Sequence, residues 1–195
     1  MVEPSRIGEV IEASTAGLVA QCYELHVPPP LGSLVRTRSG SILIYGLVHN
    51  ARTGSIEPGR YPIARGYDEE EEADVYRKNP QLSKLLRTDF EVLIVGYKED
   101  SLHQYLPPVP ARVHSFVFLC EWEEVEEFSR SLNFLNLLLE AKVPVAVDEL
   151  VGASLRYASR AHADPRAFLV GAGRELATLL GAELHRLNAL LKRLK

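Results

Sequence analysis

Short runs of Val, Ile, Leu and Tyr dominate the first half of the chain, and Gly, Pro or Ser residues bound each run. This pattern is typical of short β-strands. The longest run is interrupted by Gly46, which predicts a bulge or a sharp bend where a sheet curls on itself. Five or six short strands with such a bend predict a small closed antiparallel barrel. The expected strands cover residues 7–11, 17–25, 33–38, 41–53 and 90–97, with 113–119 as a further candidate.

The composition changes between residues 54 and 88. Five consecutive acids, Asp68 to Glu72, open a predicted helix, in the first turn where the helix dipole favours negative charge. Asn79-Pro80 ends this helix, and residues 81–87 form a second short one. The acidic run has two interpretations, a site for a cation or basic partner and a solvated helix start. The second is favoured because blocks of like charge usually face solvent. We therefore expect a helical insertion near residues 68–87.

Apolar positions recur at three- and four-residue steps from residue 121 to the end, which is typical of amphipathic helices. The expected helices cover residues 121–130, 132–141 and 147–161. Asp164-Pro165 is a helix start signal, and it predicts one long helix over residues 166–194. Such a helix is longer than a small barrel is wide, so its leucine stripe predicts a homodimer. The interface would contain Leu180, Leu184, Leu187 and Leu191.

These patterns together predict an α+β chain. An N-terminal small antiparallel β-barrel spans residues 1–112 and carries the helical insertion, and an α-helical region spans residues 113–195. Tyr105-Leu106-Pro107-Pro108-Val109-Pro110 is too rich in proline for a helix or central strand and predicts an extended segment. It has two interpretations, a ligand for an SH3-type domain and a structural segment along the barrel wall. The structural one is favoured because Tyr105 and Leu106 give the segment an apolar side to bury.

The composition is that of an ordinary globular protein, with 195 residues, 46% hydrophobic residues and a net charge of −4. A mildly acidic chain lacks the global positive field that favours binding to nucleic acid backbones, which leaves only a local basic patch for that role. The first residues contain no apolar signal segment, and no run approaches the roughly 18 apolar residues of a membrane span. We therefore expect a cytoplasmic protein with reduced thiols and no membrane contact.

No catalytic constellation emerges from the residue spacing, so we expect neither an enzyme nor a cofactor. Gly171-Ala-Gly173 fails both the dinucleotide and the phosphate-loop patterns, and no serine lies in a Gly-x-Ser-x-Gly motif. The histidines are scattered without zinc-type spacing. A metal site formed by His103, His114 and Cys120 around the proline-rich turn remains an open, weaker alternative.

Basic residues and an aromatic residue lie on adjacent predicted strands. Arg36, Arg38 and Tyr45 would share one face of the barrel, and Arg60 and Tyr61 continue the pattern. Barrels that bind oligonucleotides use such faces to stack bases and neutralise the backbone. The same residues would also suit any solvated sheet face.

Three short motifs carry a family resemblance: Ile7-Gly8-Glu9-Val10, Leu31-Gly32-Ser33-Leu34-Val35 and Ile44-Tyr45-Gly46-Leu47-Val48. Together they resemble the HAS barrel, the small β-barrel shared by HerA-type DNA-translocating ATPases and ATP synthase subunits. The resemblance covers roughly the first half of the chain. With its proline-rich segment, His114 and helical tail, the whole chain resembles small stand-alone bacterial HAS-barrel proteins. No Walker A motif follows the barrel motifs, so the motor activity of the ATPases is not carried over.

The resemblance implies docking and subunit contact at the face of a larger assembly. We therefore expect a non-enzymatic interaction module whose partner is a HerA-type ATPase, an associated nuclease or another DNA-processing assembly. A single-stranded nucleic-acid-binding barrel is the alternative. The residues expected to bind a partner or nucleic acid are Arg36, Arg38, Tyr45, Tyr105, Pro107 and Pro108.

Overall fold

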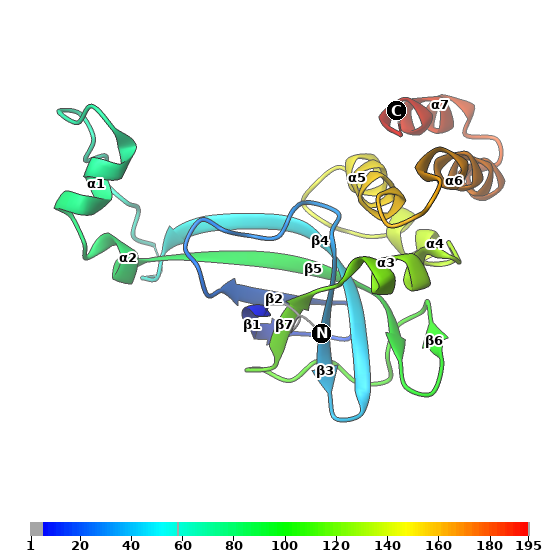
Figure 1. Ribbon diagram of the computed structural model, residues 1–195, viewed down its shortest axis with the longest axis horizontal. Coiled ribbons are helices and arrows are strands. Elements are labelled where there is room, and N and C mark those ends of the chain that lie inside the picture. Colours follow the sequence, from blue (N-terminus) through cyan, green and yellow to red (C-terminus); the bar gives the residue numbers. More distant parts are fainter. Residues whose placement is uncertain (1–5, 58, 195) are drawn as a thin grey trace.

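A computed structural model describes residues 6–57 and 59–194. Six antiparallel strands close into a barrel in the order β2, β1, β7, β3, β4, β5, and β5 pairs back with β2 (Figure 1). This confirms the predicted α+β class with a small antiparallel barrel. β6 (Leu102–His103) adds a short edge beyond β5. The barrel strands are β1 (Arg6–Ala13), β2 (Gly17–Cys22), β3 (Leu34–Ser39), β4 (Ile42–Ser55), β5 (Leu86–Lys98) and β7 (Phe116–Leu119).

Alternate side chains of the strands point into the barrel and form the first of two apolar cores. Phe90 and Val10 are completely buried there, because successive residues of a strand face opposite sides of the sheet. Gly46 lies at a register shift between β4 and β5, as its position in the sequence predicts. A methyl group on Gly46 would overlap Val92 and would lie 2.8 Å from the carbonyl oxygen of Leu93. The bulge therefore depends on the absence of a side chain.

The strand that closes the barrel lies beyond the predicted boundary at residue 112. β7 runs between β1 and β3, where Phe118 pairs with both Arg6 and Arg36. The barrel therefore extends to Leu119, and the helical region begins at Trp122. A run of four residues gives a weak strand signal by itself. β7 is stabilised as a strand because it is hydrogen-bonded to β1 on one side and to β3 on the other.

A layer of helices covers the outer face of β3, β4 and β5 and forms the second core. Leu47 and Val95 of the barrel pack there against Phe128, Leu135 and Leu150 of the helices. The helices of this layer are α3 (Trp122–Ser129), α4 (Phe134–Leu139) and α5 (Val147–Ser159), close to the predicted ranges.

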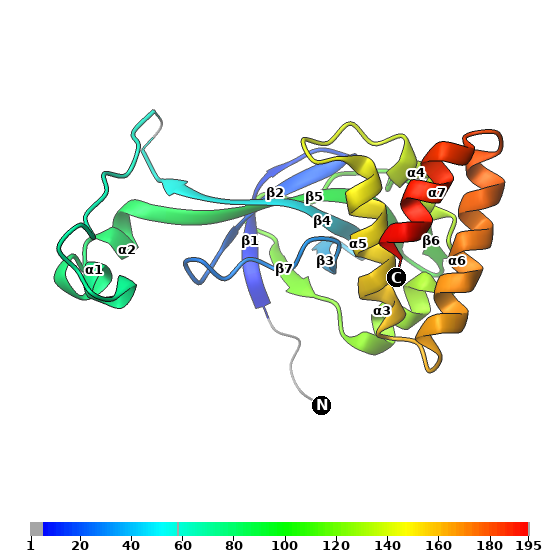
Figure 2. The ribbon, with the colours of Figure 1, turned by 90° about the horizontal axis from the view of Figure 1, so that it is seen from above.

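The predicted single helix over residues 166–194 is two helices, α6 (Pro165–Leu180) and α7 (Leu184–Arg193). The start is as predicted, because the Asp164 carboxylate accepts a hydrogen bond of 2.9 Å from the Ala167 amide. The chain reverses at Gly181, whose φ of 50° suits glycine. α7 then lies beside α5 and α6 (Figure 2), and Leu190 is completely buried. The leucine stripe is thus partly covered within its own chain.

β4 and β5 continue past the barrel as a two-stranded arm. β5 pairs with β2 as far as Asp89, so the free ladder runs from the pair Thr53–Thr88 to the pair Ser55–Leu86. It leads to the predicted helical insertion, α1 (Glu72–Lys78) and α2 (Leu82–Leu85). The arm points away from the helical layer along the long axis of the molecule (Figures 1 and 2). We call the described residues between β4 and β5 the arm tip. In the part of the chain that the structure describes, no helix is both long and apolar enough to cross a membrane.

Candidate functional site

The structure does not bring Arg36, Arg38 and Tyr45 together as an exposed face. Tyr45 is only 4% exposed and packs against Phe128 of α3, with ring centroids 5.4 Å apart. This burial raises the pKa of the Tyr45 phenol. The Nε of Arg36 donates a hydrogen bond of 3.0 Å to Glu124 of the same helix, whereas Arg38 is exposed. Tyr45 is therefore unavailable for stacking on a base, because the helical layer covers this side of the barrel.

The structure does not bring the three residues of the possible metal site together. His103 is hydrogen-bonded to Tyr105, with 3.0 Å between Nδ1 and the phenol oxygen, and His114 is hydrogen-bonded to Glu9. Cys120 is buried, which raises the pKa of its thiol. Residues 6–57 and 59–194 contain no group of three or more His, Cys, Asp or Glu side chains arranged to hold a metal ion.

Among the residues that the structure describes, two serine–histidine pairs lie at hydrogen-bond distance: Ser129 with His162, and at the surface Ser101 with His103, where the hydroxyl oxygen is 3.0 Å from Nε2. The Ser129 hydroxyl oxygen lies 2.8 Å from Nε2 of His162, but Ser129 is only 3% exposed. The same hydroxyl donates to the Val125 carbonyl oxygen at 2.6 Å, as a serine inside a helix commonly does. The His162 ring stacks on Phe168 at 4.1 Å between centroids. The pair of Ser129 and His162 therefore belongs to the packing of α3 against the loop between α5 and α6.

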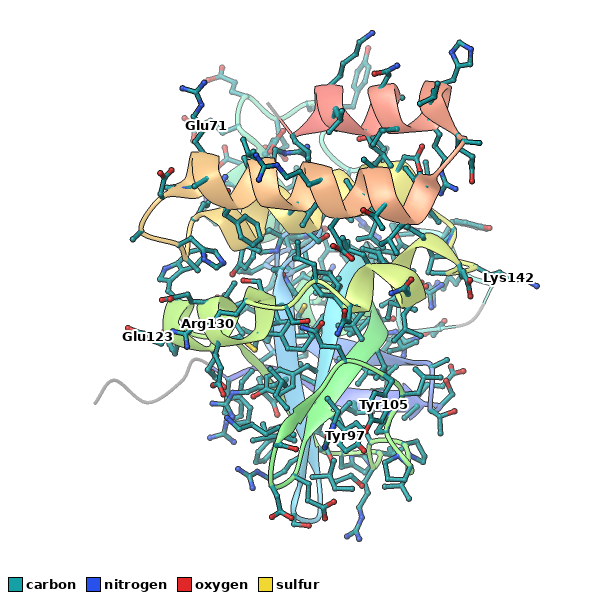
Figure 3. The ribbon with its side chains drawn as sticks, turned by 90° about the vertical axis from the view of Figure 1, so that its right-hand side faces the viewer. Glu71, Tyr97, Tyr105, Glu123, Arg130 and Lys142 are labelled. Atoms are coloured by element: carbon teal, nitrogen blue, oxygen red, sulfur yellow. The ribbon has the colours of Figure 1, made fainter. Side chains whose placement is uncertain are left out.

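His49 lines a hollow of about 480 Å³ between the barrel and the segment that joins α4 to α5. Gly17 and Val92 contribute from the barrel, and Leu137 and Lys142 from the helical side; Figure 3 shows Lys142 at the edge of the molecule. The Nδ1 atom of His49 is buried without a hydrogen-bond partner, and burial lowers the pKa of the ring. A neutral imidazole without a nucleophile or a carboxylate partner does not form a catalytic site. The scattered histidines of the sequence gave no sign of this position.

The proline-rich segment is anchored at both ends and exposed between them. Gln104 accepts a hydrogen bond from the Phe134 amide at 3.1 Å and donates to the Phe128 carbonyl oxygen at 2.6 Å, so it joins two helix ends. Pro107 and Ala111 are buried. Between Gln104 and Ala111 the exposed residues are Tyr105, Leu106, Pro108, Val109 and Pro110, which we call the proline-rich strip.

Tyr105 also belongs to an aromatic cluster on the surface. Its ring centroid lies 5.6 Å from that of Tyr97 and 5.1 Å from that of His103. Figure 3 shows Tyr97 and Tyr105 side by side at one end of the barrel. Of the sequence-predicted residues in this segment, the structure therefore places Tyr105 and Pro108 on the surface, whereas Pro107 serves as an anchor.

The arm carries a second concentration of exposed side chains. Tyr61, Ile63 and Tyr67 are 88%, 78% and 98% exposed. Neither α1 nor α2 contains a buried residue. The sequence groups Tyr61 with the possible nucleic-acid face, but Tyr61 lies in the arm tip after the end of β4, whereas Tyr45 packs against the helical layer.

A basic hollow of about 250 Å³ lies where the tip meets the arm. Arg52, Arg60 and Arg87 line it together with Tyr61. Arg87 is paired with the buried Asp89, whose carboxylate lies 3.0 Å from the guanidinium Nε. Arg52 lies 3.9 Å from the same carboxylate and Arg60 is paired with Glu57 at 2.7 Å, and these two arginine side chains are 63% and 65% exposed.

No protein-family model matches the chain, and no curated protein matches it. The resemblance to HAS-barrel proteins therefore rests on the three glycine motifs, and the barrel architecture does not by itself identify a family. A barrel is a scaffold that hosts many unrelated functions. Function must therefore be argued from the surfaces that this chain presents.

Proposed function

We propose that this chain is a non-enzymatic interaction module, a HAS-like barrel that docks on a larger assembly such as a HerA-type ATPase or another DNA-processing complex. One observation carries the proposal: exposed large apolar side chains gather on two separate surfaces, the proline-rich strip and the arm tip. Proteins that act alone rarely expose contiguous apolar patches, and such patches mark interaction sites. Two separate patches suit a module that joins more than one partner.

The proline-rich strip supports docking because it is already ordered. Tyr105, Leu106 and Val109 are 54%, 40% and 43% exposed, on a segment held by Gln104 and Pro107. Tyrosine supplies a large contact area at a low cost in side-chain entropy. A segment that needs no rearrangement also loses less conformational entropy when it binds. The strip is therefore the surface on which we expect the larger assembly.

The engagement of the reactive side chains supports a non-enzymatic role. Ser129 and His162 are used in packing, and His114 is held by Glu9. The exposed pair Ser101–His103 has no carboxylate partner among the described residues to orient its ring. Catalysis requires a nucleophile or base that substrate can reach. The described residues present polar chemistry mainly as contacts within the fold.

The test is capture of the partner from native lysate on wild-type protein and on the variant Tyr105→Ser/Leu106→Ser/Val109→Ser. We expect the wild type to recover an oligomeric ATPase or a nuclease, identified by mass spectrometry, and the variant to recover at least tenfold less. Val27→Ser is the matched control, because Val27 is 59% exposed and lies outside the strip. Recovery of this chain alone, or of a partner that is insensitive to the strip variant, would count against the proposal.

Binding of single-stranded nucleic acid is a second candidate, favoured by the basic hollow on the arm. Arg52 and Arg60 beside the exposed ring of Tyr61 offer charge neutralisation and stacking together. Fluorescence anisotropy of short labelled oligonucleotides at low and moderate salt tests it. Binding that weakens steeply with salt, and weakens again in Arg52→Gln/Arg60→Gln, supports this function. An absence of binding at low salt removes it.

A further inference from the structure

His49 occupies a bulge in the longest strand of the barrel. In the ladder between β4 and β5, Val48 pairs with Val92. The next pair joins Asn50 to Glu91, so His49 is an extra residue between two regular pairs. A bulge bends the strand locally and redirects the side chain of the extra residue. The ring that is placed in this way lines the hollow between the barrel and the segment that joins α4 to α5, residues 140–146.

The His49 side chain is buried without its full set of hydrogen bonds. It is 7% exposed, and its Nδ1 atom has no hydrogen-bond partner among the described residues. A buried polar atom without a partner lowers stability, and most such atoms in proteins are paired with protein groups or with ordered water. A ring that retains this cost in the wall of a hollow is suited to form a hydrogen bond with a bound molecule.

Two hollows share this ring as part of their walls. The larger one has a volume of about 480 Å³, within the range of about 300–1,000 Å³ that is common for ligand sites. The smaller one, of about 190 Å³, shares Ser14, Gly17, His49 and Val92 with it. The Ser14 hydroxyl is engaged within its own turn, where it donates to the Gly17 carbonyl oxygen at 3.1 Å. Of these shared residues, His49 is therefore the one that offers an unpartnered polar atom.

The larger hollow is lined mainly by apolar residues. Ile94 comes from β5, Leu137 from α4 and Val143 from the segment that follows α4. Ligand sites usually combine such a lining with a few polar groups that fix the orientation of the ligand. The apolar body of a ligand would therefore fill this space, with its polar group at His49.

The charged residues around the ring favour a ligand without a net charge. Glu140 and Lys142 give the larger hollow one charge of each sign. Glu12 and Glu91 line the smaller hollow, and their carboxylates disfavour an anion beside His49. Burial lowers the pKa of the His49 ring below 6.5, so the ring is uncharged at neutral pH. A hydroxyl group suits a neutral imidazole, because it can donate to one type of ring nitrogen and accept from the other.

We propose that this hollow binds a small neutral molecule with an apolar body and one hydroxyl group, such as an alkylphenol. The hydroxyl group forms a hydrogen bond with the His49 ring, and the apolar body lies between the barrel and residues 140–146. Such a molecule touches both layers of the fold, so its binding stabilises the protein. The site is independent of the proposed docking role, because Leu106 at its edge is the single residue of the proline-rich strip that lines it.

The first test is titration of the purified full chain with p-cresol and three matched probes, toluene, p-toluate and p-methylbenzylamine. Amide chemical shifts measured by nuclear magnetic resonance give the affinities, and a rise in the unfolding temperature gives a second readout. We expect p-cresol to bind with a dissociation constant of about 1 mM or below, as a ligand of this size can. Toluene should bind about fivefold more weakly, because it lacks the hydrogen bond. Both charged probes should also bind more weakly than p-cresol.

Two variants locate the site. His49→Phe keeps an aromatic ring, so it should bind p-cresol and toluene equally, and it should remain folded because it removes an unpartnered buried nitrogen. Ala141→Trp places a large side chain in the hollow and should weaken the binding of p-cresol at least tenfold. Ala146→Trp is the matched control, because Ala146 is exposed in the same segment and does not line the hollow. Circular dichroism checks that each variant is folded.

Four results overturn the proposal: no binding of p-cresol at its highest soluble concentration, equal binding of toluene by the wild type, tighter binding of a charged probe, or binding that folded Ala141→Trp leaves unchanged. A preference for p-cresol over toluene that survives in His49→Phe also contradicts it. Failure of this proposal and failure of the proposed function are distinguishable. The titrations use the purified chain alone, whereas partner capture depends on the proline-rich strip.

Discussion

Gly32 lies where the loop between β2 and β3 touches the helical layer. Its φ of 78° is in the left-handed region, which side chains rarely adopt. A methyl group there would lie 2.5 Å from the Ser154 amide nitrogen and 2.6 Å from the Ala153 carbonyl carbon, both in α5. Backbone atoms cannot move aside as a flexible side chain can. Gly32 therefore sets how closely α5 approaches the barrel.

Gly32→Ala should destabilise the protein by at least about 2 kcal/mol, because it adds a steric overlap to the strain of a positive φ. Gly40→Ala is the matched control, since Gly40 has a φ of 63° and no atom within 4 Å of an added methyl. Its cost should be only the backbone strain, about 1–2 kcal/mol. Urea unfolding measures both. Equal losses would show that contact with α5 contributes nothing.

His49 makes stability depend on pH. In the folded state, burial lowers the pKa of the His49 ring below its ordinary value of 6.5, and the negative charge of Glu91 partly opposes this shift. As the pH falls through 6.5, the unfolded chain therefore binds a proton that the folded protein does not, and stability falls. His49→Gln should reduce the loss between pH 7.5 and 5.5, by no more than about 1.4 kcal/mol per pH unit. Urea unfolding at both values checks this, and an unchanged slope would contradict it.

At the scale of elements, the last two helices show how a leucine stripe is covered. The chain reverses at Gly181, so that α7 returns over α5 and α6. Leu190 and Leu194 then become buried, whereas Leu184 remains 63% exposed. Three- and four-residue periodicity indicates which residues share a helix face. It does not indicate whether one continuous helix or two separate helices carry that face.

Leu190→Ala should therefore destabilise the protein by about 2–5 kcal/mol, as expected for a completely buried leucine. Leu184→Ala should change stability by no more than about 0.5 kcal/mol, because the side chain already faces water. Chemical unfolding of the two variants separates them. Similar losses would mean that α7 does not pack as described.

The same limit explains which parts of the fold and surface could be predicted. Local sequence signals were sufficient to predict the bulge at Gly46, the start of α6 at Asp164 and most of the strands and helices. Tyr45 was predicted to be exposed, and it is covered by Phe128. Strand alternation gives the residues on one face but not what lies over that face. A contact between residues so far apart in the chain is a property of the tertiary fold.

At the scale of the whole molecule, the arm is separate from both cores. The barrel core and the helical core contain no side chain from α1 or α2. One hydrogen bond of 2.6 Å joins the tip to the barrel loop, between Nε2 of His26 and the hydroxyl of Tyr76. Such a bond contributes only about 1 kcal/mol. An extension that costs chain entropy and adds little to folding is most simply explained by a role in binding.

Replacing residues 56–85 by Asn-Gly tests this argument. Ser55 and Leu86 are paired across the arm, so a two-residue turn fits between them. The shortened protein should unfold with a free energy within about 1 kcal/mol of the wild type, because it keeps both cores and loses only the contact with His26. It should still capture the partner of the proline-rich strip. A shortened protein that fails to fold would show that the arm tip stabilises the barrel. The main role of the tip would then be structural, which would contradict the role in binding.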